Sequence, residues 1–175
     1  VAIQLEQGMT LWERQLHSKM VTALVGYRDG TAVSADWTGK IVVWNSVDGT
    51  EVTNFQQHRD RVSSLIAIDP DDASQRPSLI SASRDGTVRL WYPTQNRLVR
   101  FIDLRQPVTA LAIVSGLRIL AATQSGQVQL LDLSNAKSIN TLETQLDHIT
   151  AIRVLGDDLI AISGEGPNRL IKLPK

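Results

Sequence analysis

The segment LISASRDGTVRLW, residues 79–91, carries the pattern that decides the fold of this chain. Short apolar stretches lie on both sides of Arg84-Asp85-Gly86, a tripeptide rich in turn-forming residues. Polar and apolar residues alternate at period two before and after this turn, which is typical of β-strands with one face buried. The segment therefore predicts two antiparallel strands joined by a tight turn.

Flanking segments extend this pair to a unit of four strands. VSSLIAID at residues 62–69 precedes it and RLVRFIDL at residues 97–104 follows it, both with β-like patterns. The start of the unit recurs as VTAL, VSSL, VTAL and ITAI, beginning at Val21, Val62, Val108 and Ile149. The spacing is roughly 41–46 residues, which is the length of a four-stranded propeller blade, and no helical period of useful length is present.

These segments resemble the repeats of the WD-repeat family. Residues 79–91 are similar to its signature for the second and third strands of a blade, and SADWTGKIVVWN at residues 34–45 is a weaker copy. The resemblance implies an all-β fold of four-stranded antiparallel β-propeller blades, arranged as an incomplete arc of a larger WD-type propeller. As a single segment, the chain would contain a partial blade at 1–20, blades at 21–61, 62–107 and 108–148, and a partial blade at 149–175.

The terminal strands of such an arc would lack partners. We expect the remainder of a larger propeller to supply them, because a closed ring of four WD blades would be unusual. The start at Val1 instead of methionine agrees with a piece of a longer protein. Self-pairing of two arcs is the less favoured alternative.

Many blades of the WD-repeat family are held by a hydrogen-bonded network of a histidine, a serine or threonine, an aspartate and a tryptophan. In the second unit the matching residues are His58, Ser81 or Ser83, Asp85 and Trp91. Buried polar groups of this kind each cost about 1–3 kcal/mol when left unpaired, so a complete set would stabilise the blade. The choice between the two serines stays open here.

The first unit departs from this pattern at one position. It has His17, Ser34 and Trp44 at the matching places, but Thr38 stands where the aspartate is expected. Asp36 lies two residues earlier, and we expect it to substitute only if the turn bends.

The third unit lacks the network altogether. Leu104, Ala121, Ser125 and Leu131 occupy the four positions, so we expect apolar packing to hold this blade. His148 is out of register with the other two histidines, and we expect it in a solvated loop.

Catalytic and metal chemistry find little support in the sequence. There is no cysteine, and the three histidines are about forty or more residues apart, so neither a metal site nor a cofactor is expected. A hydrolase triad of histidine, serine and aspartate is disfavoured because the same residue types recur in part at blade spacing. The acidic stretch at residues 69–72 lacks the spaced ligands of a calcium loop. We expect no enzyme.

Charge and hydropathy exclude further classes of partner. Eighteen basic residues balance eighteen acidic residues, so no global field attracts nucleic acid or an anionic membrane. The chain has no run of 18 apolar residues and no signal peptide at its start. We therefore expect a soluble, cytoplasmic protein that binds neither nucleic acid nor membrane.

The resemblance places the binding surface on the rim of the propeller. The residue before the turn aspartate projects there, and its equivalents are Trp37, Arg84 and Gln124. Tryptophan and arginine are enriched at interface hot spots, although Trp37 could instead fold onto a neighbouring blade. We expect a non-catalytic protein–protein interaction scaffold that binds a protein or peptide partner. The alternative is a regulatory or sensory propeller domain of a larger multidomain enzyme.

Overall fold

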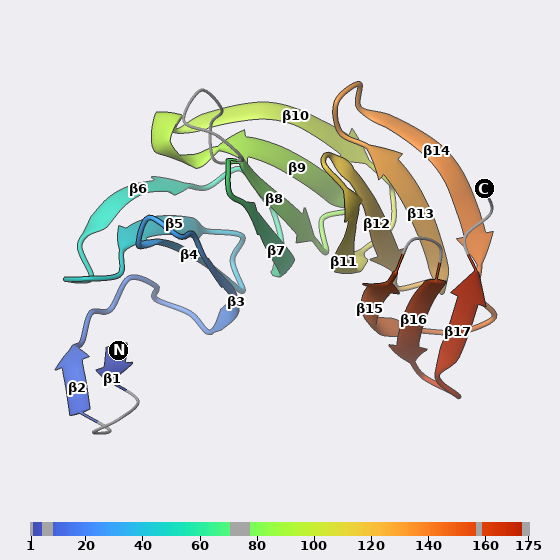
Figure 1. The fold of residues 1–175 in the computed structure, drawn as a ribbon, viewed down its shortest axis with the longest axis horizontal. Coiled ribbons are helices and arrows are strands. Elements are labelled where there is room, and N and C mark those ends of the chain that lie inside the picture. Colours follow the sequence, from blue (N-terminus) through green and yellow to red (C-terminus); the bar gives the residue numbers. More distant parts are fainter. Residues whose placement is uncertain (1, 5–8, 71–77, 157–158, 173–175) are drawn as a thin grey trace.

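The computed structural model describes residues 2–4, 9–70, 78–156 and 159–172, and these form an open arc of antiparallel sheets (Figure 1). The sheets follow one another around the arc in chain order, and β1 and β2 lie apart at its amino-terminal end. The prediction of an all-β arc of propeller-type blades is confirmed. The acidic stretch considered for calcium continues into residues 71–77, which lie outside the described residues.

Each sheet is a meander in which chain neighbours pair antiparallel. Blade 1 contains β3 (Val21–Gly26), β4 (Thr31–Asp36), β5 (Ile41–Asn45) and β6 (Glu51–Phe55). Blade 2 contains β7 (Val62–Ile68), β8 (Ser78–Ser83), β9 (Thr87–Tyr92) and β10 (Arg97–Asp103), with the 3₁₀ turn η1 (Pro93–Gln95) between its last two strands. Blade 3 contains β11 (Val108–Ser115), β12 (Arg118–Thr123), β13 (Gln127–Asp132) and β14 (Lys137–Glu143). Blade 4 contains β15 (Ile149–Leu155), β16 (Leu159–Gly164) and β17 (Arg169–Lys172), and a separate hairpin pairs β1 (Ala2–Gln4) with β2 (Met9–Trp12).

Burial differs across a blade in a way that the simple alternating pattern does not predict. The second strands β4, β8 and β12 are buried at five successive positions, so residues on both faces of each strand are covered. The fourth strand β14 is instead exposed at six of its seven positions. The blade is therefore most apolar in its inner half and most polar at its outer edge.

Three apolar clusters join consecutive blades. The cluster between blades 1 and 2 includes Val33, Phe55, Leu65 and Trp91, and the Phe55 and Trp91 ring centroids lie 4.7 Å apart. The clusters between blades 2 and 3 and between blades 3 and 4 are made of aliphatic side chains, most of them from the first three strands of each blade. Because each cluster takes residues from two sheets, each blade is stabilised mainly by its neighbours.

The equivalent positions on the first strand of blade 1 lie on a face that no other blade covers within the described part of the chain. Val62, Leu65 and Leu111 are 0–7% exposed on the inner strands of blades 2 and 3. Their counterparts on β3, Val21 and Leu24, are 49% and 62% exposed. The sequence motif is therefore the same in all these blades, and only the presence of a neighbour decides its burial.

This difference predicts unequal costs for the same substitution. Leu111→Ala removes a buried side chain and should lower the free energy of unfolding by about 2–4 kcal/mol. Leu24→Ala at the equivalent exposed position should change it by less than about 0.5 kcal/mol. Urea unfolding followed by tryptophan fluorescence measures both, and equal losses would contradict the open face of blade 1.

Candidate functional site

Four polar side chains form a continuous hydrogen-bonded chain in blade 2. His58 lies 2.9 Å from Asp85 through Nδ1 and 2.8 Å from the Ser81 hydroxyl through Nε2. The indole nitrogen of Trp91 donates to the same hydroxyl at 2.8 Å. Ser83 does not join this chain, because its hydroxyl donates to the Asp60 carbonyl at 2.9 Å. Of the two candidate serines, the structure uses Ser81.

The direction of these hydrogen bonds follows from the groups that can only donate or can only accept. The Trp91 indole can only donate, and the Asp85 carboxylate can only accept. Neutral His58 therefore donates from Nδ1–H to the carboxylate, and the Ser81 hydroxyl donates to Nε2 while accepting from the indole. Every polar group of the chain is satisfied in this arrangement without a charged imidazole.

The pKa directions agree with a neutral histidine beside a charged carboxylate. Burial lowers the pKa of His58, and this outweighs the nearby Asp85 carboxylate, which acts in the opposite direction. Burial would raise the pKa of Asp85, but hydrogen bonds from His58, Thr87 and the Arg59 backbone hold it well below its usual range. At neutral pH the folded blade therefore contains a neutral imidazole and an ionised carboxylate.

The same geometry recurs in blade 1 with the carboxylate shifted along the chain. His17 lies 2.9 Å from Asp36 and 2.7 Å from the Ser34 hydroxyl, which accepts from the Trp44 indole at 3.1 Å. One oxygen of Asp36 accepts both the backbone N–H and the hydroxyl of Thr38, at 2.8 and 2.7 Å. The side chain at the end of β4 thus reaches the histidine from a position two residues earlier than in blade 2.

The expectation that Asp36 could take this place only by bending the turn is wrong. Gly39 N–H donates to the Asp36 carbonyl at 3.3 Å, and Gly86 N–H donates to the Ser83 carbonyl at 3.2 Å. These are the same turn bond at equivalent positions, so the backbone path is retained. The carboxylate of Asp36 reaches the histidine because its side chain extends from the last position of β4.

Blade 3 replaces the network with apolar contacts. Leu104, Ala121 and Leu131 are buried within one cluster between blades 2 and 3. Ser125 stays exposed at the turn, where its hydroxyl lies 3.1 Å from that of Thr123. His148, expected in a solvated loop, is only partly exposed, and its carbonyl accepts the Glu165 N–H at 2.8 Å.

The order of aspartate, histidine and serine in blade 2 resembles that of a hydrolase triad, but its surroundings do not. The Ser81 hydroxyl belongs to a residue that is 0% exposed, and it already accepts a bond from Trp91. A nucleophile needs space beside it for a substrate carbonyl and donors for the developing oxyanion. The arrangement is therefore suited to stabilising the blade.

One backbone bond defines the rim of the arc in all four blades. In each blade, the residue after the second strand donates its N–H to the carbonyl of the residue before the first strand, over 2.8–3.1 Å. The donor and acceptor pairs are Trp37 and Met20, Arg84 and Arg61, Gln124 and Pro107, and Glu165 and His148. The three rim residues expected from the sequence thus occupy equivalent places, and Glu165 is a fourth that the longer turn of blade 4 concealed.

Side chains on this rim contact the next blade along. The Trp37 ring is 46% exposed, and the guanidinium of Arg61 lies 5.0 Å from its centroid. Arg84 donates from Nη2 to the Gln124 side-chain carbonyl at 2.9 Å. Trp37 therefore contacts the residue that leads into the neighbouring blade and still presents nearly half of its surface to solvent.

Sequence reasoning missed a set of hydroxyl groups that join the blades at the inner strands. Thr22 donates to the Val62 carbonyl at 2.5 Å, and Ser63 donates to the Val108 carbonyl at 2.6 Å. Both are the second residue of the repeated motif at the start of each unit. The signal was the threonine or serine at this place in the first two motifs, VTAL and VSSL, whereas the equivalent Thr109 and Thr150 donate to carbonyls of their own blades.

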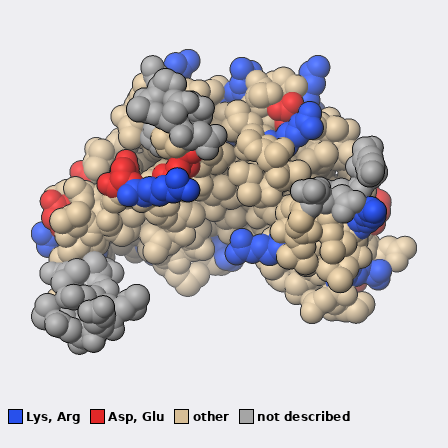
Figure 2. Space-filling view, viewed as in Figure 1, with Lys and Arg blue, Asp and Glu red and all other residues tan. Residues whose placement is uncertain are grey.

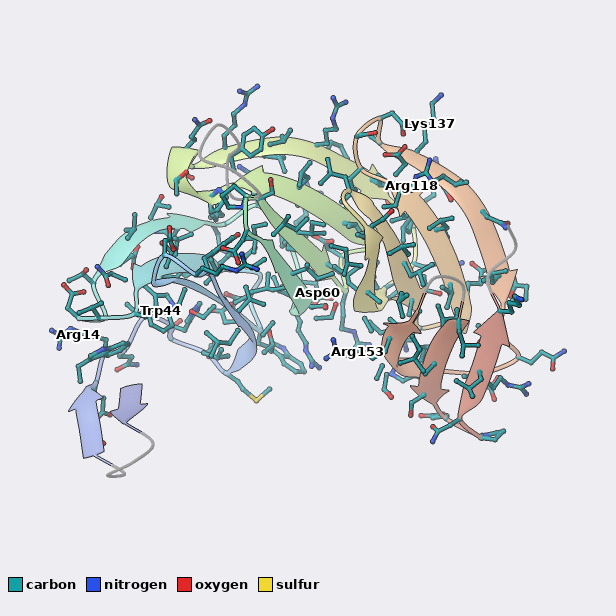
Figure 3. All side chains as sticks on the ribbon, in the orientation of Figure 1. Arg14, Trp44, Asp60, Arg118, Lys137 and Arg153 are labelled. Carbon is teal, nitrogen blue, oxygen red and sulfur yellow. The ribbon has the colours of Figure 1, made fainter. Side chains whose placement is uncertain are left out.

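The inner strands β3, β7, β11 and β15 line a groove of about 580 Å³ on the concave side of the arc. Arg153 projects from β15 on this side, and Asp60 lies near the start of β7 (Figure 3).

Within the described ranges, no three histidine, cysteine, aspartate or glutamate side chains are grouped to hold a metal ion. The described part of the chain also contains no helix with the length and apolar character needed to cross a membrane.

Charged side chains of both signs are scattered over the face shown in Figure 2, and most of that face carries neither. This distribution agrees with the equal numbers of basic and acidic residues in the sequence.

The blade 2 network predicts a large effect for a small substitution. Ser81→Ala leaves both the His58 Nε2 atom and the Trp91 indole without a partner in a buried site. The free energy of unfolding should fall by about 2–4 kcal/mol, measured by urea unfolding. Ser138→Ala, at an exposed position of β14, is the matched control and should change it by less than about 0.5 kcal/mol. Similar values for the two variants would show that the network adds little.

The pKa directions predict a two-step loss of stability in acid. Because the pKa of His58 is lower in the folded chain than in the unfolded chain, its contribution is complete above about pH 6.5 and is lost as pH falls below that value. The lowered pKa values of Asp36 and Asp85 add a second loss below about pH 4. Each group adds at most about 1.4 kcal/mol per pH unit to the slope.

Urea unfolding of wild type and His58→Leu between pH 7.5 and 3.5 measures this profile. The variant carries the residue type found at the equivalent blade 3 position, Leu104, and should lose the upper step while keeping the part of the lower step that comes from Asp36. An unchanged upper step in the variant would assign that step to another group.

Comparison with known proteins agrees with the architecture. The family model described as WD domain, G-beta repeat, matches residues 49–92. The chain is 31% identical over 108 residues to mouse WD repeat-containing protein 41, covering 60% of this chain and 24% of that protein. It is 28% identical over 170 residues to mouse telomerase protein component 1, covering 94% of this chain and 6% of that protein. The solved structure of U3-55K superposes with a TM-score of 0.79 at 19% identity, covering 91% of this chain and 51% of that one.

Proposed function

We propose that this WD-repeat chain, an arc of β-propeller blades, is a non-catalytic scaffold that binds a protein or peptide partner on its rim. The observation that carries the proposal is the placement of Trp37 and Arg84 at equivalent rim positions by the same backbone bond. The chain spans about a quarter or less of the length of the two curated relatives described above, so this proposal concerns the rim of the arc itself.

The chemistry of the rim supports a protein partner. Trp37 keeps 46% of its surface exposed although it is a large aromatic side chain within a polar turn. Arg84 is held by Gln124 of the next blade, so less side-chain freedom would be lost when it meets a partner. Aromatic and arginine side chains in such fixed positions are the residue types that supply most of the binding energy at interfaces.

The buried polar groups support a role without catalysis. The histidines of blades 1 and 2 are committed to Asp36 and Asp85 and to serine hydroxyls, and His58 and Ser81 are at most 3% exposed. Their bonds are satisfied within the blade, so they are poorly placed to act on a substrate. The balance of basic and acidic residues likewise favours a protein partner over nucleic acid. A cytoplasmic location belongs to the same proposal, and fluorescence microscopy of the tagged protein tests it.

Affinity capture with rim variants tests the scaffold role. Trp37→Ala and Arg84→Ala should each reduce capture of the partner from a native lysate by about tenfold or more, because each removes an anchoring side chain. Ile139→Ala is the control, since Ile139 is 49% exposed on β14 at the outer edge of blade 3. Quantitative mass spectrometry of the captured proteins measures all three. Partners that all variants retain equally would place binding elsewhere on the chain.

A further inference from the structure

Two arginines share a small pocket on the rim, between the inner strands of blades 2, 3 and 4. The pocket has a volume of about 180 Å³ and is lined by Arg61, Ser63, Arg84, Thr109, His148 and Thr150. Arg84 N–H donates to the Arg61 carbonyl at 2.9 Å, so both side chains start from adjacent points of the backbone. A space of this size accommodates one functional group of a ligand.

Both guanidinium groups are positioned by neutral neighbours. Trp37 lies 5.0 Å from the Arg61 guanidinium on one side, and Gln124 accepts from Arg84 at 2.9 Å on the other. Among the described residues, neither guanidinium has a carboxylate oxygen within the 4.0 Å of an ion pair. Arg61 and Arg84 thus both line this pocket, and no ion pair with a described carboxylate offsets their charges, so an anionic ligand would gain electrostatic energy there.

An unused donor strengthens this assignment. The Nε–H of Arg61 is buried and has no hydrogen-bond partner among the described residues. The nearest acidic neighbour in the chain, Asp60, uses its carboxylate to accept the Arg61 backbone N–H at 2.6 Å. A buried donor without an acceptor is unfavourable by about 1–3 kcal/mol, and more for a charged group.

The hydroxyls in the lining leave Arg61, Arg84 and His148 as the remaining side-chain donors. The hydroxyls of Ser63, Thr109 and Thr150 already donate to backbone carbonyls, at 2.6, 3.2 and 3.3 Å. Their protons are therefore committed to the blades, whereas the guanidinium groups offer fork-shaped donors suited to a carboxylate or a phosphate.

We propose that this pocket binds a single anionic side chain, a carboxylate or a phosphorylated residue, of a peptide segment in the partner. The inference rests on the proposed rim-binding function and adds the chemical class of the bound segment. Trp37, which is 46% exposed beside Arg61, provides an apolar surface for the residue next to the anion. The bound segment is thus an acidic or phosphorylated position flanked by an apolar residue.

Terminally blocked peptides test the pocket directly with the 175-residue chain. The probes are Gly-Leu-Asp-Leu-Gly, its phosphoserine counterpart and its asparagine counterpart, titrated while NMR follows the arginine Nε–Hε signals. We expect saturable shifts at Arg61 and Arg84 from an anionic peptide, with the asparagine peptide at least about tenfold weaker. Tighter binding of the aspartate peptide indicates an acidic segment, and tighter binding of the phosphoserine peptide indicates a phosphorylated one.

Matched arginine variants distinguish binding in the pocket from a general effect of positive charge on the chain. Arg61→Gln and Arg84→Gln should each weaken binding of the preferred peptide about tenfold, whereas Arg100→Gln, exposed on β10, should leave it unchanged. Urea unfolding of the variants confirms that each is folded. Absence of saturable shifts from both anionic peptides, equal binding of the asparagine peptide, or an equal loss in Arg100→Gln would overturn the proposal.

The two proposals fail in different ways. If a partner is captured through Trp37 and Arg61→Gln captures it equally, the rim scaffold stands and the anion pocket falls. If the anionic peptides bind Arg61 and Arg84 but no captured protein depends on Trp37 or Arg84, the pocket stands and the scaffold falls.

Discussion

The structure depends on one constraint, which is that each blade presents two apolar faces and can bury them only against other blades. The second strands of blades 1 to 3 are buried at five of their six positions, and the three apolar clusters all lie between sheets. Leu24 is exposed although its counterparts Leu65 and Leu111 are buried, because no described blade packs against this part of β3. Local strand propensity favours the hairpins, whereas packing between blades forms the apolar core.

Two solutions to the same packing position coexist in this chain. Blade 2 fills it with Trp91, whose indole needs an acceptor, and the buried His58 and Asp85 follow from that need. Blade 3 fills it with Leu131 and Leu104, which need no polar partner. A buried polar network and a well-packed apolar set can be comparable in stability, so the choice in one blade does not constrain the next. The network adds directional bonds between the loop before the blade and its turn, which apolar packing does not supply.

The sequence was sufficient for the features that repeat and insufficient for those that arise between blades. The repeated motifs located the strands, the blade 2 network and the equivalence of Trp37, Arg84 and Gln124, because each follows from a position within one unit. The role of Asp36 was misjudged because a motif compares positions, whereas a flexible side chain can reach the same point from two residues away. The contact of Trp37 with Arg61 links the turn of blade 1 to the loop that leads into blade 2, and its geometry is set by packing that the repeated motif does not encode. The longer turn of blade 4 likewise concealed Glu165.

The hydroxyl bonds from Thr22 to Val62 and from Ser63 to Val108 have a geometric consequence. They fix the spacing of neighbouring sheets at the smallest radius, where the inner strands meet, while bulkier side chains hold the sheets apart farther out. At these two seams the blades therefore act as wedges whose thin edge is held by a hydrogen bond and whose thick edge is set by side-chain volume. The curvature of the whole assembly follows from the ratio of these two thicknesses. A change of side-chain volume at the outer radius would thus alter the opening angle, whereas loss of the hydroxyl of Thr22 or Ser63 would remove a bond across the seam.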